Sequence, residues 1–162
     1  MKTLKITVFT KCLSALIIGI LLGIILIQSA SASIFSAAIN FAAGNKTYRA
    51  RSEVALSLHL SSNRYVAYGI GHINPTDNSN VPIGYIGARG RLFRYNGNNS
   101  HTLIEESNLR FNTKATNAFE AGIDAWATNG WTYNANGTVE AWNPQTGRYV
   151  VQNANRTRNL SN

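Results

Sequence analysis

The chain has 162 residues, and its 15 Lys and Arg outweigh 7 Asp and Glu to give a formal net charge of +8. This length allows one domain and a short appendage. The single cysteine excludes a disulfide framework and any zinc or iron–sulfur site built on several cysteine ligands. Composition therefore limits the chemistry of the protein, while the order of the residues must indicate where it goes and how it folds.

The first 32 residues have the three zones of a secretory signal peptide. Three lysines precede an apolar run over residues 12–27, and Ala30-Ser31-Ala32 then supplies the small residues that a signal peptidase requires. We predict a signal peptide over 1–32, with cleavage after Ala32, and a secreted domain over 33–162. The alternative is an uncleaved membrane anchor, although the apolar run is shorter than the roughly 20 residues of a spanning helix. Cleavage would remove the three lysines and the only cysteine, leaving a charge of +5 and no stable membrane span.

Beyond the signal peptide, apolar and polar residues alternate with a period of two, which is typical of strands with one buried and one wet face. Asn96-Gly97, Asn129-Gly130 and Asn136-Gly137 predict turns, with a weaker signal at Thr146-Gly147. For the apolar residues 34–43, the sequence predicts either a first strand or a loose terminus. The fold class is therefore predicted to be all-β, a single antiparallel β-sandwich or barrel-like domain of about six to eight strands. The predicted strands cover residues 48–61, 64–74, 83–95, 101–111, 131–142 and 148–153, and Asn136-Gly137 allows a hairpin within the fifth of these.

One segment departs from the period of two. Phe119, Ile123 and Trp126 have helical spacing, and Asn117 followed three residues later by Glu120 resembles a capping box. We therefore predict at most one short helix near 117–128, with a long loop as the alternative.

The titratable residues form no recognisable catalytic or metal-binding motif. The histidines at 59, 72 and 101 lack the spacing of a ligand pair, and no Gly-x-Ser-x-Gly elbow occurs. The seven carboxylates show no spacing that selects the pair needed for glycoside hydrolysis. The oxygen-rich loop at 75–80 contains a single Asp and favours an Asx turn over a calcium site. The sequence thus predicts no catalytic residue, no metal and no other cofactor.

Arginines and aromatic residues are the strongest candidates for binding. Arg89 and Arg91 lie two residues apart, hence on one face of a strand, and guanidinium groups suit phosphate or carboxylate. Aromatic residues crowd the last third of the chain and can stack on sugar rings. The alternatives are a solvated strand face for the arginines and core packing for the aromatic residues. The candidate binding residues are Arg89, Arg91, Arg94, Trp131, Trp142 and Tyr149.

The segment Val81–Phe93, with the sequence VPIGYIGARGRLF, resembles a glycine-rich strand of small secreted all-β proteins from Bacillus-type Gram-positive bacteria. Gly137–Asn143 and Gly147–Tyr149 are similar to later segments of those proteins, so the resemblance covers about residues 81–162. Gly90 stands where the family has alanine, and residues 119–126 have no counterpart in it. The resemblance implies secretion and a β domain of uncharacterised function, and it transfers no catalytic residues.

These features predict a secreted, non-enzymatic β module that associates with the cell surface or with an extracellular polyanion or polysaccharide of the cell wall. Export and the lack of a recognition motif argue against a dedicated nucleic-acid role. One alternative is a secreted antagonist or toxin-like protein acting on other cells or membranes, motivated by the positive charge and the apolar residues 34–43. A small extracellular hydrolase is the third candidate. The sequence indicates no oligomeric state.

Overall fold

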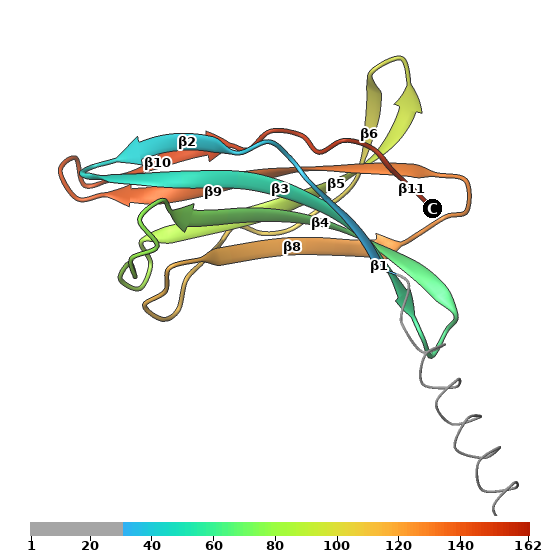
Figure 1. The fold of residues 1–162 in the computed structure, drawn as a ribbon, viewed down its shortest axis with the longest axis horizontal. Coiled ribbons are helices and arrows are strands. Elements are labelled where there is room, and N and C mark those ends of the chain that lie inside the picture. The colour runs from blue at the N-terminus through green and yellow to red at the C-terminus, as the bar shows by residue number, and fades with distance from the viewer. Residues whose placement is uncertain (1–30) are drawn as a thin grey trace, which may run out of the picture. The chain divides into compact units, whose positions relative to one another are not determined.

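A computed structural model describes residues 31–162, and all regular structure in this part of the chain is β-strand (Figure 1). The signal peptide predicted over 1–32 lies outside the described residues, apart from Ser31 and Ala32, which begin the first strand. Cleavage after Ala32 would therefore leave that strand with its last three residues. Within 31–162 there is no helix long and apolar enough to cross a membrane.

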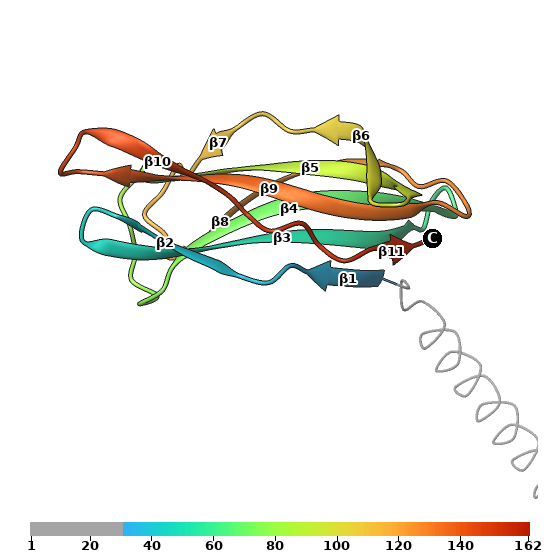
Figure 2. The same ribbon diagram turned by 90° about the horizontal axis from the view of Figure 1, so that it is seen from above.

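The strands form two antiparallel sheets, which lie as two layers in Figure 2 and confirm the predicted fold class. The first sheet has the order β1 (Ser31–Phe35), β3 (Lys46–His59), β4 (Arg64–Pro75) and β8 (Phe119–Trp126), with β2 (Ile39–Ala43) also on β3. The second has the order β10 (Arg148–Asn153), β9 (Thr132–Asn143), β5 (Ile86–Gly97) and β6 (Ser100–Glu106), with β7 (Arg110–Phe111) on β5 and β11 (Leu160–Ser161) on β9.

Residues 31–162 form eleven strands, more than predicted, because three edge rows of the sheets are each divided into two short strands and residues 119–126 add β8. β1 and β2 pair with successive parts of β3, β6 and β7 with successive parts of β5, and β10 and β11 with successive parts of β9. The apolar stretch at 34–43 supplies β2 and part of β1, and its Ile34 and Phe41 pack against the core. Each sheet is thus four strands wide.

The helix predicted near 117–128 is wrong, because the segment forms strand β8. Residues 119–126 pair with β4 in continuous register, from Ile73 opposite Phe119 to Val66 opposite Trp126. Every second residue of β8 faces the core: Phe119, Ala121, Ile123 and Ala125. Trp126, which the helical spacing placed on the apolar face, is 48% exposed. Pairing with β4 satisfies the backbone of this segment and overrides its resemblance to a helix start.

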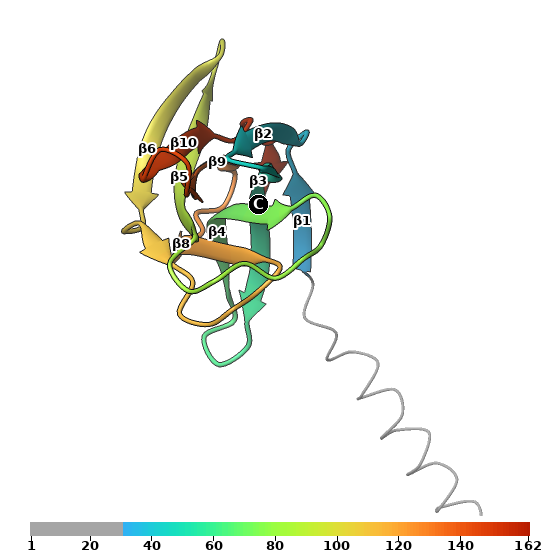
Figure 3. The same ribbon diagram turned by 90° about the vertical axis from the view of Figure 1, so that its left-hand side faces the viewer.

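Two of the four predicted turns were confirmed as placed, one lies two residues later than predicted, and one is wrong. Asn129-Gly130 and Thr146-Gly147 form turns with positive φ at both glycines. The turn predicted at Asn96-Gly97 is displaced: both residues end β5, and the turn is formed by Asn98 and Asn99. This β5–β6 hairpin projects from the sandwich in Figure 3. The hairpin allowed at Asn136-Gly137 is wrong: both residues lie within β9 and pair with β5.

Gly137 belongs instead to a waist where the two sheets touch through their backbones. This glycine waist consists of Gly69 and Gly71 on β4, Gly90 on β5 and Gly137 on β9. A Cβ on Gly137 would lie 2.6 Å from the Cα of Gly71, and one on Gly69 would lie 2.7 Å from the carbonyl oxygen of Arg91. Only glycine permits so close an approach.

The waist divides the apolar interior into two buried clusters, one toward each end of the sandwich. Ser52 lies between them, is fully buried and joins the two sheets. Its Oγ accepts a hydrogen bond from the Gly137 amide at 2.8 Å and donates to the Asn155 carbonyl at 2.7 Å. The larger cluster includes Tyr48, Ile73, Ile86, Val139 and Ala141, and the smaller one includes Val54, Leu56, Leu92, Tyr133 and Ala135.

Candidate ligand-binding face

The outer face of the second sheet carries Arg89 and Arg91, as their spacing predicted. Their strand neighbours Ala88 and Leu92 point inward and are fully buried. Arg89 Nη1 lies 2.8 Å from Glu106 Oε1, and Arg91 Nε lies 4.0 Å from the same oxygen. The two guanidinium groups therefore share one carboxylate.

Polar side chains of β9 hold Arg91 in place. Its Nη2 donates to Asn136 Oδ1 at 2.7 Å and to Thr138 Oγ1 at 2.8 Å. Asn136 and Thr138 stand opposite Arg91 and Arg89 in the register, so these contacts cross directly between neighbouring strands. Arg91 is thus fixed at the centre of the face while part of its positive charge remains uncompensated.

Trp142 and Tyr149 lie on the same outer face, opposite each other on β9 and β10. Their ring centroids are 5.1 Å apart, and the ring of Phe111 lies 4.9 Å from that of Tyr149. The Tyr149 hydroxyl donates to the Gly84 carbonyl at 2.7 Å, which fixes the ring. We call Phe111, Trp142 and Tyr149 the aromatic platform. Trp142 is four residues from Thr138, so about 13 Å separates the platform from the arginines.

Arg94 and Trp131 do not belong to this face. Arg94 is paired with Tyr133, whose side chain is buried in the interior, and its guanidinium carbon lies 4.3 Å from the centroid of the Trp131 ring. Eleven residues of β9 and its lead-in separate Trp131 from Trp142, which corresponds to about 36 Å of extended chain. The six predicted residues therefore divide into four on the outer face and two at the far end of the sandwich.

Arg156 joins the outer face from the C-terminal segment, and sequence reasoning missed it. Its guanidinium carbon lies 4.5 Å from the centroid of the Phe93 ring. Burial, and then the nearby charge of Arg91, lower the pKa of Arg156. Within residues 31–162 no carboxylate lies at ion-pair distance from it. We call Arg89, Arg91 and Arg156 the cationic row.

The pKa of His101, beside the cationic row, lies below its usual value of about 6.5 because of burial and the charge of Arg156. Asn134 Nδ2 donates to its Nδ1 at 2.9 Å, which requires that this nitrogen carry no proton. The unfolded chain therefore binds the His101 proton at a higher pH than the folded protein does. We expect the stability to fall as the pH is lowered through about 6.5, measured as the urea midpoint.

The variant His101→Gln isolates this contribution from those of His59 and His72. We expect its urea midpoint to change less between about pH 7.5 and about pH 5.5 than that of the wild type. An unchanged pH dependence in this variant would contradict the assignment.

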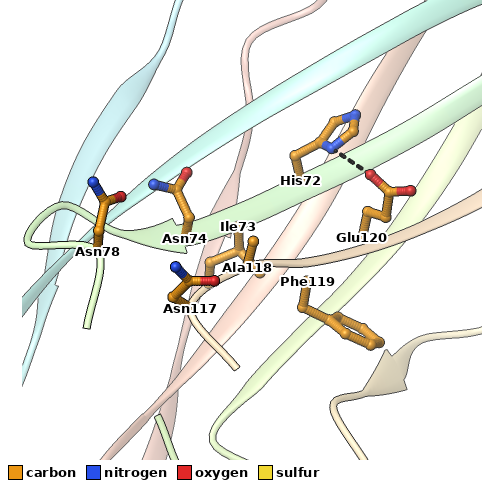
Figure 4. Close-up of a pocket in the computed structure, with 8 residues that line it drawn as sticks. All are labelled: His72, Ile73, Asn74, Asn78, Asn117, Ala118, Phe119 and Glu120. Carbon is orange, nitrogen blue, oxygen red and sulfur yellow. Dashed lines mark ion pairs between the residues drawn. The ribbon is translucent and has the colours of Figure 1, made fainter. Parts of the chain in front are cut away.

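A pocket of about 420 Å³ lies at the first sheet, where β4 ends and β8 begins (Figure 4). Beside it, the ring of His72 bridges two carboxylates, with Nε2 2.9 Å from Glu53 Oε2 and Nδ1 3.0 Å from Glu120 Oε2. The two nitrogens point in opposite directions, so the three side chains do not converge on one point. The pocket is lined by His72, Ile73, Asn74, Asn78, Asn117, Ala118, Phe119 and Glu120.

The loop at 75–80 forms the Asx turn that its composition favoured. Asp77 Oδ1 accepts hydrogen bonds from the Ser79 amide at 3.0 Å and from the Ser79 hydroxyl at 2.7 Å. These bonds, together with Lys46, lower the pKa of Asp77 to about 2. In residues 31–162 no group of three or more His, Cys, Asp or Glu side chains is arranged to hold a metal ion.

Comparison with known proteins gave no match to any family model, any curated protein or any solved structure. The candidate face is therefore interpreted from its own geometry.

Proposed function

We propose that this protein is a secreted, non-enzymatic module that binds a polysaccharide of the cell surface or its surroundings along the outer face of the second sheet. The observation that carries the proposal is the aromatic platform and the cationic row on that one face. A flat row of this kind suits a long polymer, which can contact both groups at once.

The platform would contact the apolar faces of sugar rings. Tyr149 is 39% exposed, and its ring is fixed by Phe111, Trp142 and the hydrogen bond to Gly84. A rigid aromatic surface loses little conformational entropy on binding, which favours affinity. Glu140 lies between the platform and the arginines on the same face, and its carboxylate can accept hydrogen bonds from sugar hydroxyls.

The cationic row would favour acidic groups on the polymer. Arg89 and Arg91 share the single carboxylate of Glu106, whereas Arg156 has no ion pair within residues 31–162 and is repelled by Arg91. A phosphate or carboxylate placed between them would relieve that repulsion and accept hydrogen bonds from the guanidinium groups. This arrangement supports an acidic polysaccharide, such as a phosphate-bearing wall polymer, over a neutral one.

The test is a binding assay with the full chain, exported by a Gram-positive expression host. The probes are purified cell walls with and without their anionic polymer, and a soluble neutral polysaccharide. We expect the tightest binding to walls that retain the anionic polymer, with the affinity falling as ionic strength rises because salt screens the arginine contacts. Absence of binding to every probe at low ionic strength would refute the proposal.

A further inference from the structure

The pocket at the end of β4 is remote from the aromatic platform and the cationic row. His72, Asn74 and Glu120 belong to the outer face of the first sheet, whereas the platform lies on the outer face of the second. Its volume of about 420 Å³ falls in the range of small-molecule sites. Figure 4 shows side chains from β4, from the following loop and from the start of β8 around one space.

The lining of the pocket is rich in amide groups that have no partner in the protein. Among residues 31–162, the side chains of Asn78 and Asn117 make no hydrogen bond. The Asn74 amide donates to the Pro75 carbonyl at 3.2 Å, which leaves its oxygen free to accept. Each amide offers both a donor and an acceptor, and a hydroxyl group can use both.

The charges around the pocket balance locally. Glu120 is the only acid in the lining, and its carboxylate is held by His72. On the same outer face, Arg51 stands opposite His72 and Arg49 opposite Asn74. Glu53 lies on the other side of His72, so two acids accompany these two arginines; the formal charges around the pocket cancel and do not select an ion.

We propose that this pocket binds a neutral, hydroxyl-rich ligand, and specifically a single uncharged sugar unit. The amides of Asn74, Asn78 and Asn117 would hydrogen-bond its hydroxyls. His72 fixes the Glu120 carboxylate at the pocket wall, where its second oxygen accepts from a further hydroxyl. The site does not depend on the polysaccharide face and would give the protein a second carbohydrate contact on its other side.

The test is a titration of the full-length exported chain with uncharged monosaccharides, followed through backbone amide NMR shifts. Glucose, galactose and N-acetylglucosamine serve as neutral probes, and glucuronate as a charged one. We expect at least one neutral sugar to shift the amides of Asn78, Asn117 and Phe119 saturably, with weaker binding of glucuronate. No saturable shift with any neutral probe, or equal binding of glucuronate, would overturn the proposal.

Two variants locate the binding within the pocket. We expect Asn117→Ala to weaken sugar binding about 5- to 10-fold, since it removes one or two hydrogen bonds. Asn78→Gly should also weaken it, and glycine keeps the positive φ of 54° at that position. Asn80→Ala, in the same loop but outside the lining, is the matched control and should bind as the wild type does. Equal binding by Asn117→Ala and Asn80→Ala would place the sugar elsewhere.

These experiments distinguish failure of the pocket proposal from failure of the proposed polysaccharide face. Substitutions in the pocket should leave binding to anionic cell walls unchanged, and a substitution in the aromatic platform should leave the monosaccharide shifts at Asn117 unchanged. Loss of both activities by Asn117→Ala would contradict the independence of the pocket.

Discussion

Replacing Gly90 by alanine is expected to lower the free energy of unfolding by about 3 kcal/mol, at the upper end of what overpacking costs. The new Cβ would overlap the carbonyl oxygen of Gly69 and lie 2.8 Å from its carbonyl carbon. Both atoms belong to the backbone of β4, so no change of side-chain rotamer can relieve the contact. The sheets would have to separate at the waist, which would strain the hydrogen bond between Ser52 and Gly137 and loosen both apolar clusters.

Chemical denaturation followed by tryptophan fluorescence measures this effect. Gly147→Asn is the matched control, because Gly147 has a φ of 65° and nothing within 4 Å of a built Cβ. Asparagine tolerates that conformation, so we expect a change within about 0.5 kcal/mol. Equal stabilities for Gly90→Ala and the wild type would show that the sheets are not in backbone contact.

Replacing Trp142 by alanine is expected to weaken binding to anionic cell walls about 30-fold, which corresponds to roughly 2 kcal/mol for a central aromatic anchor. Trp142 is the central ring between Tyr149, 5.1 Å away, and Tyr85, 6.5 Å away. Its removal deletes sugar-stacking area and also removes one of the three contacts that hold the Tyr149 ring. Both effects lower affinity without touching the cationic row, so the salt dependence of the remaining binding should persist.

The control for this variant is Trp126→Ala, which removes an exposed tryptophan on the first sheet, where it packs with Arg64 and His59. We expect this variant to bind cell walls as the wild type does. Trp142→Phe should recover most of the affinity, since it restores an aromatic ring. Equal affinities for Trp142→Ala and Trp126→Ala would show that the aromatic platform is not part of the binding site.

Local pattern predicted the strands well wherever one face of the strand is buried. The alternation from Tyr48 onward corresponds to β3, and the range 148–153 coincides with β10. The prediction for residues 119–126 failed because a helical and a strand pattern overlap there. Phe119 and Ile123 fit the spacing of a helix as well as that of a strand. Only a strand would also bury Ala121 and Ala125, and these side chains are too small to give a clear signal. Pairing with β4 decides between the two patterns, and β4 lies almost fifty residues earlier in the chain.

The candidate site was predicted only in part, because local patterns show which residues share a strand face but not which strands are neighbours. Strand alternation put Arg89 and Arg91 on one face of β5, but it left open whether Trp142 on β9 packs in the core or faces outward. It could not show that these two strands are neighbours, nor that Arg94 and Trp131 lie at the other end. Arg156 had no local signal, because its place over Phe93 follows from the path of the C-terminal segment. The bridge from Glu53 through His72 to Glu120 likewise joins three strands.

The sequence by itself determined the all-β class, the places of most strands and turns, and which arginines share a strand face. These properties follow from side-chain alternation and from turn residues, which act over a few neighbouring positions. Only the tertiary structure decided that β8 is a strand, that four glycines form the waist, and that the platform, the cationic row and the amide-lined pocket exist. Each of these depends on the contact of segments far apart in the chain, where backbone pairing and close packing outweigh local preference.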